Sequence, residues 1–270
     1  MQTRSQTGSN SATPLFVDVV FIGDRSASMQ IMGNGLFNGA TKFVKTHHKL
    51  ANDCGLGESY NLKAVSFDHD SSVIYSGNAT GFFGNPYDEE YGVKQIRNGF
   101  MPRGMTRLYD TILYELKEQA DRVNKFKSSL HPSVLALNPR MVVILAVLTD
   151  GVDNRSVSRA SDVRAAVKSH IKEFDASCQF IAANQDANIT GARMGFPVDT
   201  CLQMDADPEH AEAAMECVTL SSMRTFSGES PMFSQAERIM SAGNQYSSWQ
   251  PYPPVVEDDD DDMYSQPHRV

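Results

Sequence analysis

Two apolar runs, each leading into a loop that holds an aspartate, constrain the fold of this 270-residue chain more than any other feature. Residues 17–29 read VDVVFIGDRSASM, and residues 140–154 read RMVVILAVLTDGVDN. A short, largely apolar and β-branched run that ends in a turn signal is typical of a buried strand in a parallel sheet. Because ligands bind at the carboxyl ends of such strands, we expect Asp24 and Asp150 to share one edge of the sheet.

The loops after these runs offer only oxygen ligands. Asp24, Ser26 and Ser28 supply one carboxylate and two hydroxyls, a set that suits a hard cation such as Mg²⁺. Thr106 adds a hydroxyl at the start of a helix expected over residues 106–125, where apolar residues recur at helical spacing. A cation with few ionised ligands stays electrophilic, so water or an acidic group of a partner can complete its coordination.

This pattern resembles the metal-ion-dependent adhesion site of von Willebrand factor A-type (VWA) domains, a family with intracellular bacterial and viral members. The resemblance covers residues 16–226, and residues 180–186, FIAANQD, are similar to the fifth-strand segment of those members. Met105 departs from the family pattern, in which a second small residue is common before the threonine. The resemblance implies a binding module for Mg²⁺, or Mn²⁺ in its place, rather than an enzyme. It assigns five metal ligands: Asp24, Ser26, Ser28, Thr106 and Asp150.

Alternating strands and helices predict an α/β fold with a doubly wound, mostly parallel sheet and helices on both faces, as in Rossmann-like VWA domains. A strand over residues 72–75 follows the strand over 61–67 too closely for a crossover, so we expect it to be a short antiparallel edge strand. Residues 76–104, rich in Gly, Asn and Pro, are expected to form a long loop. Further helices are expected over residues 36–51, 161–174 and 208–226.

The composition predicts tails on both sides of this domain. Residues 1–14 are polar and expected to be disordered, and residues 15–228 are expected to form the VWA domain. Residues 229–250 are expected to form a short helix or extension, followed by a Pro-rich and then acidic tail over residues 251–270. That tail carries −5 of the net charge of −9, so the remainder is nearly balanced and gives no sign of nucleic-acid binding.

Several polar residues flank the expected ligands. A cationic rim there would steer an acidic partner to the metal, although exposed arginines are common enough to gather by chance. Asp258–Asp262 of the tail are a candidate tethered ligand in cis or in trans, while a solubility or trafficking tail is the simpler interpretation. The rim residues expected from the sequence are Arg25, Arg103, Arg107, Arg155, Asn184 and Asp186.

Two alternatives to an adhesion module stay open. One is a structural or virion assembly protein that uses the domain as a scaffold. The other is a Mg²⁺-dependent phosphohydrolase of haloacid-dehalogenase type, which needs an acid/base aspartate where this chain has Ser26. Four cysteines without CxxC spacing, a polar stretch over residues 1–11 and the lack of a long apolar run predict an intracellular protein that is not secreted and has no membrane span.

Overall fold

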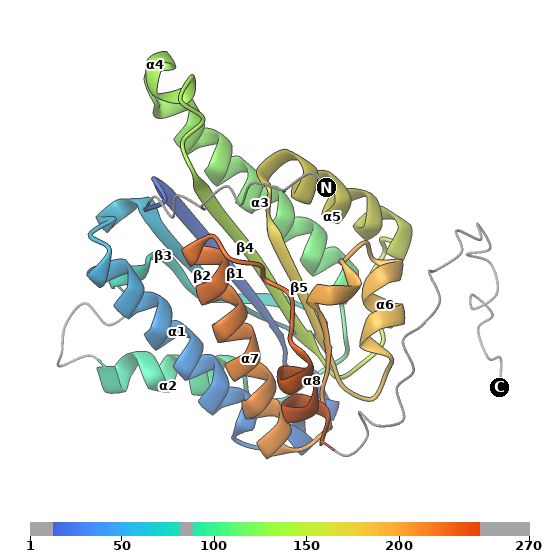
Figure 1. Ribbon diagram of the computed structural model, residues 1–270. Helices are drawn as coiled ribbons and strands as arrows, with labels where there is room; N and C mark the ends of the chain where they lie inside the picture. Colours follow the sequence, from blue (N-terminus) through green and yellow to red (C-terminus); the bar gives the residue numbers. More distant parts are fainter. Residues whose placement is uncertain (1–12, 82–88, 244–270) are drawn as a thin grey trace, which may run out of the picture.

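The computed structural model describes residues 13–81 and 89–243, and within them a six-stranded sheet forms the centre (Figure 1). The strand order is β3-β2-β1-β4-β5-β6, and all neighbours pair in parallel except β2 and β3, which are antiparallel. The strands are β1 (Phe16–Asp24), β2 (Tyr60–Phe67), β3 (Ser71–Asn78), β4 (Met141–Thr149), β5 (Ser177–Ala182) and β6 (Cys201–Gln203). The predicted fold class is confirmed, with an edge strand longer than the sequence indicated.

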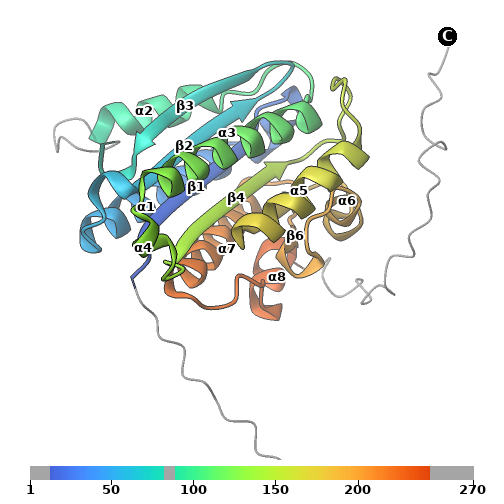
Figure 2. The ribbon, with the colours of Figure 1, turned by 90° about the horizontal axis from the view of Figure 1, so that it is seen from above.

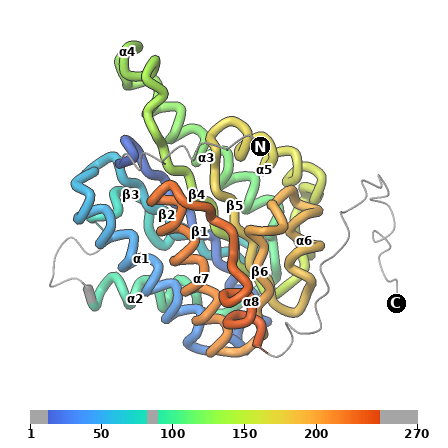
Figure 3. The backbone as a smooth tube through the Cα atoms, viewed as in Figure 1, coloured from blue at the N-terminus to red at the C-terminus, as the bar shows by residue number. Residues whose placement is uncertain are grey.

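Helices cover both faces of the sheet (Figure 2). The α-helices are α1 (Gly35–Asp53), α2 (Glu89–Gly99), α3 (Leu108–Ser129), α4 (Pro132–Leu135), α5 (Ala160–Phe174), α6 (Ala187–Arg193), α7 (Pro208–Ser227) and α8 (Gln235–Ala242). One apolar core joins the sheet to α1 and α7, and a second joins its other face to α3 and α5. Figure 3 follows the chain from α3 into α4, which projects from the body before β4 enters the sheet. No helix of the described residues is both long and apolar enough to cross a membrane.

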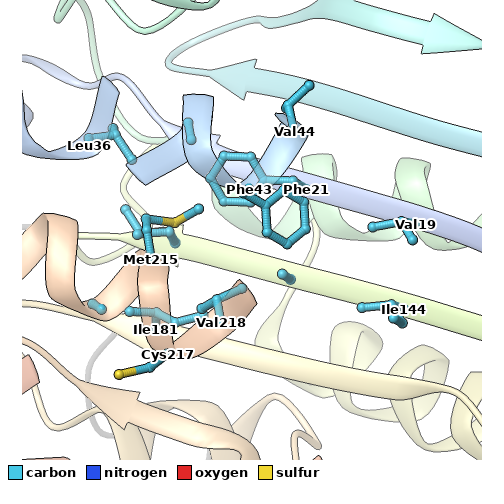
Figure 4. Packing of buried hydrophobic residues seen from close by; sticks show 14 of the residues in the cluster. Val19, Phe21, Leu36, Phe43, Val44, Ile144, Ile181, Met215, Cys217 and Val218 are labelled. Atoms are coloured by element: carbon cyan, nitrogen blue, oxygen red, sulfur yellow. The ribbon is translucent and has the colours of Figure 1, made fainter. Parts of the chain in front are cut away.

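Strand β1 contributes to both cores because successive side chains of a strand point to opposite faces. Val19 and Phe21 pack toward α1 and α7, where the Phe21 and Phe43 rings lie 5.5 Å apart (Figure 4). Val20 packs toward α3 and α5. The polar exception in the strand, Asp18, is fully buried and accepts two hydrogen bonds of 2.8 Å from the guanidinium of Arg122 on α3. Every position of β1 is therefore buried, which explains why its sequence shows no polar alternation.

Helix α1 packs so closely against α7 that there is no room for a side chain at Gly35 or Gly39 of α1. A Cβ on Gly35 would lie 1.9 Å from the Pro208 carbonyl oxygen, and a Cβ on Gly39 would lie 2.3 Å from Cβ of Met215. Pro208 also lies 3.1 Å from the Cβ position of Gly33, directly after the 3-10 helix η1 (Ala27–Met32). The loop after β1 and the beginning of α7 are therefore packed together at one edge of the sheet.

The expectation of a single long loop over residues 76–104 is wrong, because α2 occupies part of it. Ile96 of α2 and Phe100 just after it are buried in the core with α1. The many Gly, Asn and Pro residues around them hid this helical spacing in the sequence.

A further helix, α8, follows the last helix expected from the sequence. Its Glu237 pairs with Arg224 of α7 at 2.8 Å. The acidic tail, residues 244–250 and residues 1–12 lie outside the described residues.

We predict that acid destabilises the fold through His47, which is fully buried on α1 against Phe43 and bonds the Tyr60 hydroxyl at 2.6 Å. Burial lowers the pKa of His47 to about 3, so the folded protein keeps it neutral while the unfolded chain takes up a proton below pH ~6.5. Stability is therefore lost as the pH falls from 6.5 towards 3, by about 1.4 kcal/mol per pH unit. Urea unfolding of His47→Gln against the wild type should show a shallower loss over this range. An unchanged slope in His47→Gln, or an equal change in the exposed control His131→Gln, would contradict this assignment.

Candidate metal centre

The loops after β1 and β4 meet through two side-chain hydrogen bonds. The Thr149 hydroxyl donates to Oδ2 of Asp24 at 2.6 Å, and the Ser28 hydroxyl donates to Oδ1 of Asp150 at 2.8 Å. Oδ1 of Asp24 accepts the backbone N–H of Ser26 at 2.6 Å, which turns the chain back over the strand end. The two aspartates, 126 residues apart, therefore lie in one connected group because β1 and β4 are neighbours.

The three hydroxyls expected from the sequence gather at the same place. Oγ of Ser26 and Oγ of Ser28 lie 3.0 Å apart. A Cβ on Gly151 would lie 3.3 Å from Oγ1 of Thr106 and 4.0 Å from Oγ of Ser28, so a side chain there would crowd the hydroxyls. Ser28 is exposed, whereas the other four of the five expected ligands are buried. The structure thus brings together all five residues: Asp24, Ser26, Ser28, Thr106 and Asp150.

Backbone contacts hold the Thr106 loop against the loops from β1 and β4. The Thr106 N–H donates to Oδ1 of Asn154 at 3.0 Å, and the Asn154 N–H returns a bond to the Thr106 carbonyl at 3.1 Å. The Ala27 N–H donates to the Gly104 carbonyl at 3.3 Å. Helix α3 begins at Leu108, two residues after Thr106, so this hydroxyl faces the centre and does not cap the helix.

The electrostatics of the centre favour a bound cation. Burial raises the pKa of Asp24 to about 6, and the nearby charge of Asp150 adds to the rise while hydrogen bonds from Thr149 and Ser26 oppose it. Burial also raises the pKa of Asp150. Oδ2 of Asp150 is buried and has no hydrogen-bond partner among the described residues. A buried carboxylate oxygen without a partner is costly, so the group fits a positive ion at this position.

The donor set fits Mg²⁺ or Mn²⁺. The hydroxyl oxygens of Ser26, Ser28 and Thr106 and Oδ2 of Asp150 would hold a hard cation directly. Both oxygens of Asp24 already accept hydrogen bonds, so this carboxylate would support the ion through water. Bound there, the cation would supply a site for an oxygen ligand from solvent or from a partner.

The expectation that Arg25 belongs to an exposed cationic rim is corrected by the structure. Its side chain is buried, its Nε donates to Oδ2 of Asp68 at 3.0 Å, and its Nη2 donates to Oγ of Ser72 at 2.8 Å. Burial alone would raise the pKa of Asp68, but a backbone bond from Asp70 and the charges of Arg103 and Arg25 hold it below its ordinary value. Arg25 therefore ties the loop after β1 to the turn between β2 and β3 and to β3 itself.

The other expected rim arginines are more exposed. Arg103 also pairs with Asp68, at 2.6 Å, and 58% of its side-chain surface is accessible. Arg107 pairs with Asp110 at 2.7 Å with 41% accessible, and Arg155 is exposed in the loop after β4. The charge of Arg107 is thus offset by Asp110, whereas Asp68 is shared by Arg25 and Arg103, so these two arginines together with exposed Arg155 contribute the positive charge near the centre.

The segment after β5, which follows a strand at the same edge of the sheet, approaches the centre through Gln185. Asn184 is exposed with φ +54°, and Asp186 caps α6 by accepting the N–H groups of Asn188 and Ile189 at 2.9 Å each. Between them, Nε2 of Gln185 donates to the Gly151 carbonyl at 3.0 Å. Gln185, like Thr149 and Asn154, positions the metal loops. Of these three residues, Thr149 is the one that the sequence indicates most directly, because it ends a strand directly before Asp150.

A second group of metal-ligating side chains lies at the start of α7. Ligand atoms of Asp205, Asp207 and His210 lie within 4.8 Å of one another. Asp207 caps the helix by accepting the His210 N–H at 2.9 Å, and its other carboxylate oxygen bonds Nδ1 of His210 at 2.6 Å. One oxygen of Asp207 is therefore already engaged in capping α7 and the other is bonded to His210.

Comparisons with known proteins support the fold. The sequence matches no protein-family model, and no curated protein is found to be similar to it. Proximal thread matrix protein 1 from the mussel byssus aligns with a TM-score of 0.51 at 13% identity, over 76% of this chain and 47% of its own. The pilus adhesin SpaC from Lactobacillus rhamnosus GG aligns with a TM-score of 0.50 at 14% identity, over 78% of this chain and 31% of its own.

This chain therefore spans less than half the length of either protein. A structure described as von Willebrand factor type A from Catenulispora acidiphila aligns over 77% of this chain and 42% of its own, at 17% identity. Its TM-score of 0.45 is too low to support an argument. The sheet order, with one antiparallel edge strand and helices on both faces, defines a doubly wound α/β fold that the two better alignments share, and they carry no conclusion about function.

We predict that Arg25 stabilises the fold and does not act as a free cation. Arg25→Met should lower the free energy of unfolding by about 3 kcal/mol, because it removes one partner of a buried ion pair with Asp68. Arg155→Met, at an exposed position, should change it by less than about 0.5 kcal/mol. Urea unfolding with EDTA present measures both values without metal. Equal, small effects of the two substitutions would show that Arg25 is not a structural residue.

Proposed function

We propose that this protein is a divalent-cation-dependent protein-binding module that captures an acidic side chain of a protein partner. The observation that carries the proposal is Oδ2 of Asp150, which is buried beside Ser28 and the other two hydroxyls and has no hydrogen-bond partner in the described part of the chain. Mg²⁺ is the proposed ion, and Mn²⁺ would substitute for it because both prefer oxygen ligands. The ion would remain open towards solvent on the side of the exposed Ser28.

Binding explains the arrangement better than catalysis. The Ser28 hydroxyl is engaged with Asp150 and the Ser26 hydroxyl with Ser28. Within residues 13–81 and 89–243, neither hydroxyl has a hydrogen bond to a histidine base of the kind that activates a nucleophile. Asp24 has both oxygens committed to hydrogen bonds. The residue two positions after it is Ser26, which cannot serve as the acid/base of an aspartate-based phosphohydrolase.

The surroundings of the centre suit an acidic partner. Arg103 and Arg155 add exposed positive charge, which favours encounter with an acidic segment. One of the two proteins that share the fold is described as a pilus adhesin, a class of activity in line with this proposal. The acidic run Asp258–Asp262 of this chain, in cis or in trans, is one source of the captured group. All four cysteines are free, in keeping with the intracellular location that we propose.

We predict that Mn²⁺ and Mg²⁺ bind the folded protein and raise its stability. At a free metal concentration 100 times Kd, the gain in unfolding free energy is about 2.7 kcal/mol, which thermal unfolding and calorimetric titration measure together. Thr106→Val, which replaces a ligand hydroxyl by a methyl group of similar size, should weaken binding strongly. Asp24→Ala should abolish it.

The matched control is Asp70→Asn, an exposed carboxylate on the same edge of the molecule. Its metal affinity should equal that of the wild type. Metal binding that is undiminished in both Thr106→Val and Asp24→Ala, or that is absent from the wild type, would overturn the proposal.

A further inference from the structure

We propose that the acidic residue captured at the metal centre lies between large apolar residues of the partner, which pack on exposed apolar side chains around the cation. Three such side chains, Ile31, Met105 and Val152, form what we call the apolar collar. The inference rests on the proposed function and names the kind of partner segment that the same site takes. It distinguishes this centre from one that accepts any exposed carboxylate.

Exposed apolar side chains are concentrated on the loops that build the centre. Of the ten large apolar side chains that are more than half exposed in the described residues, five lie on these loops. Single exposed apolar side chains are common on protein surfaces, whereas a group of them around one site marks a binding surface. Ile31 is 56% exposed, Met105 54% and Val152 63%, and Met101 and Val157 lie further along the same loops.

Ile31 shares one face of η1 with the proposed ligand Ser28. In a 3-10 helix, side chains three positions apart lie over one another. Met29 and Met32 form the inner face of η1 and are 2% and 0% exposed. Ser28 and Ile31, also three positions apart, are both exposed. Ile31 therefore lies on the solvent side of the helix, next to the hydroxyl that donates to Asp150.

Met105 lies between a backbone contact to η1 and the proposed ligand Thr106. The Gly104 carbonyl accepts the N–H of Ala27, the first residue of η1, at 3.3 Å. Met105 follows Gly104 directly and precedes Thr106. Its position is thus fixed beside η1, while its exposed side chain is unbranched and flexible, so it adapts to apolar groups of different shape.

Val152 adjoins the centre from the loop after β4. It follows Gly151, whose Cβ position lies 3.3 Å from the Thr106 hydroxyl oxygen. The two hydrogen bonds between Thr106 and Asn154 hold this loop beside the one that carries Met105. The collar residues thus come from three segments that meet at the cation site. A ligand bound there meets apolar surface on more than one side.

The cation and the collar recognise different parts of one segment. A hard cation coordinates any carboxylate oxygen and does not distinguish one acidic segment from another. Apolar side chains that pack on the collar add affinity, because burial removes apolar surface from water on both proteins. A run of acidic residues would instead place further charges against the collar, where they lose water without gaining a partner. The segment that fits best is therefore a single Asp or Glu between large apolar residues such as Leu, Ile or Phe.

The test selects peptides on the full chain from two display libraries, one with Asp at the central position and one with Asn. All other peptide positions are random, and each selection is run with Mn²⁺ and with EDTA. We expect enrichment that depends on Mn²⁺ from the Asp library alone. The enriched peptides should carry large apolar residues directly beside the central Asp.

Variants of the protein then assign the apolar preference to the collar. Fluorescence polarisation with one enriched peptide should show that Ile31→Ser, Met105→Ser and Val152→Ser each weaken binding by about tenfold. The matched control is Leu137→Ser, which is 81% exposed just before β4, at the opposite edge of the sheet, and should bind the peptide as the wild type does. Calorimetric titration with Mn²⁺ alone should give the wild-type metal affinity for the three collar variants.

The other outcomes separate this inference from the proposed function. If the Asp library is enriched with Mn²⁺ but polar residues flank the central Asp, capture of an acidic group stands and the collar is wrong. The collar is also wrong if the variants bind the peptide like the wild type, or if they lose Mn²⁺ and peptide to the same extent. If Mn²⁺ enriches no peptide of the Asp library on the wild type, the proposed function and the inference both fail.

Discussion

The parallel pairing of β1 with β4 is the constraint on which the rest of this site depends. The chain leaves β1 to form β2 on one side and returns through α3 to form β4 on the other, so the two strand ends open next to each other. Where the connections after two adjacent parallel strands run to opposite sides of the sheet, a crevice forms at the carboxyl ends of those strands. The hydrogen bond from Thr149 to Asp24 closes the base of that crevice and holds the carboxylate in place.

The centre combines tight packing with an unbalanced charge. Two carboxylates are buried at the strand ends, and the basic side chain nearest in sequence, Arg25, is turned away to Asp68. Pairing Arg25 with Asp24 would have neutralised the site, and its engagement with Asp68 keeps the aspartates available to a cation. Burial is the main cause of the raised pKa of Asp24, and the charge of Asp150 adds to the rise. A protein interior tolerates such a pair of carboxylates only where a positive ion or a proton compensates for it.

The fold class and the five proposed ligands could be predicted from sequence because the signals are local. A buried parallel strand needs a nearly continuous apolar run, and a ligand loop at its end needs small polar residues within a few positions. Helix α2 could not be predicted in this way, since its apolar positions are few and become meaningful only against α1. The same holds for Arg25, because nothing in the sequence near it indicates a partner at Asp68, 43 residues away.

The sequence by itself therefore determined which segments become strands and which oxygen-bearing residues lie at their ends, since apolar periodicity and turn residues act over a few positions. The tertiary structure alone decided which charges are buried together and which remain exposed. Thr149, Asn154 and Gln185 became supports of the centre only when the loops met. Met105 and Val152, both exposed, came to lie on neighbouring loops for the same reason. Such groupings depend on distances between segments far apart in the chain, and only the packing of helices on the sheet sets those distances.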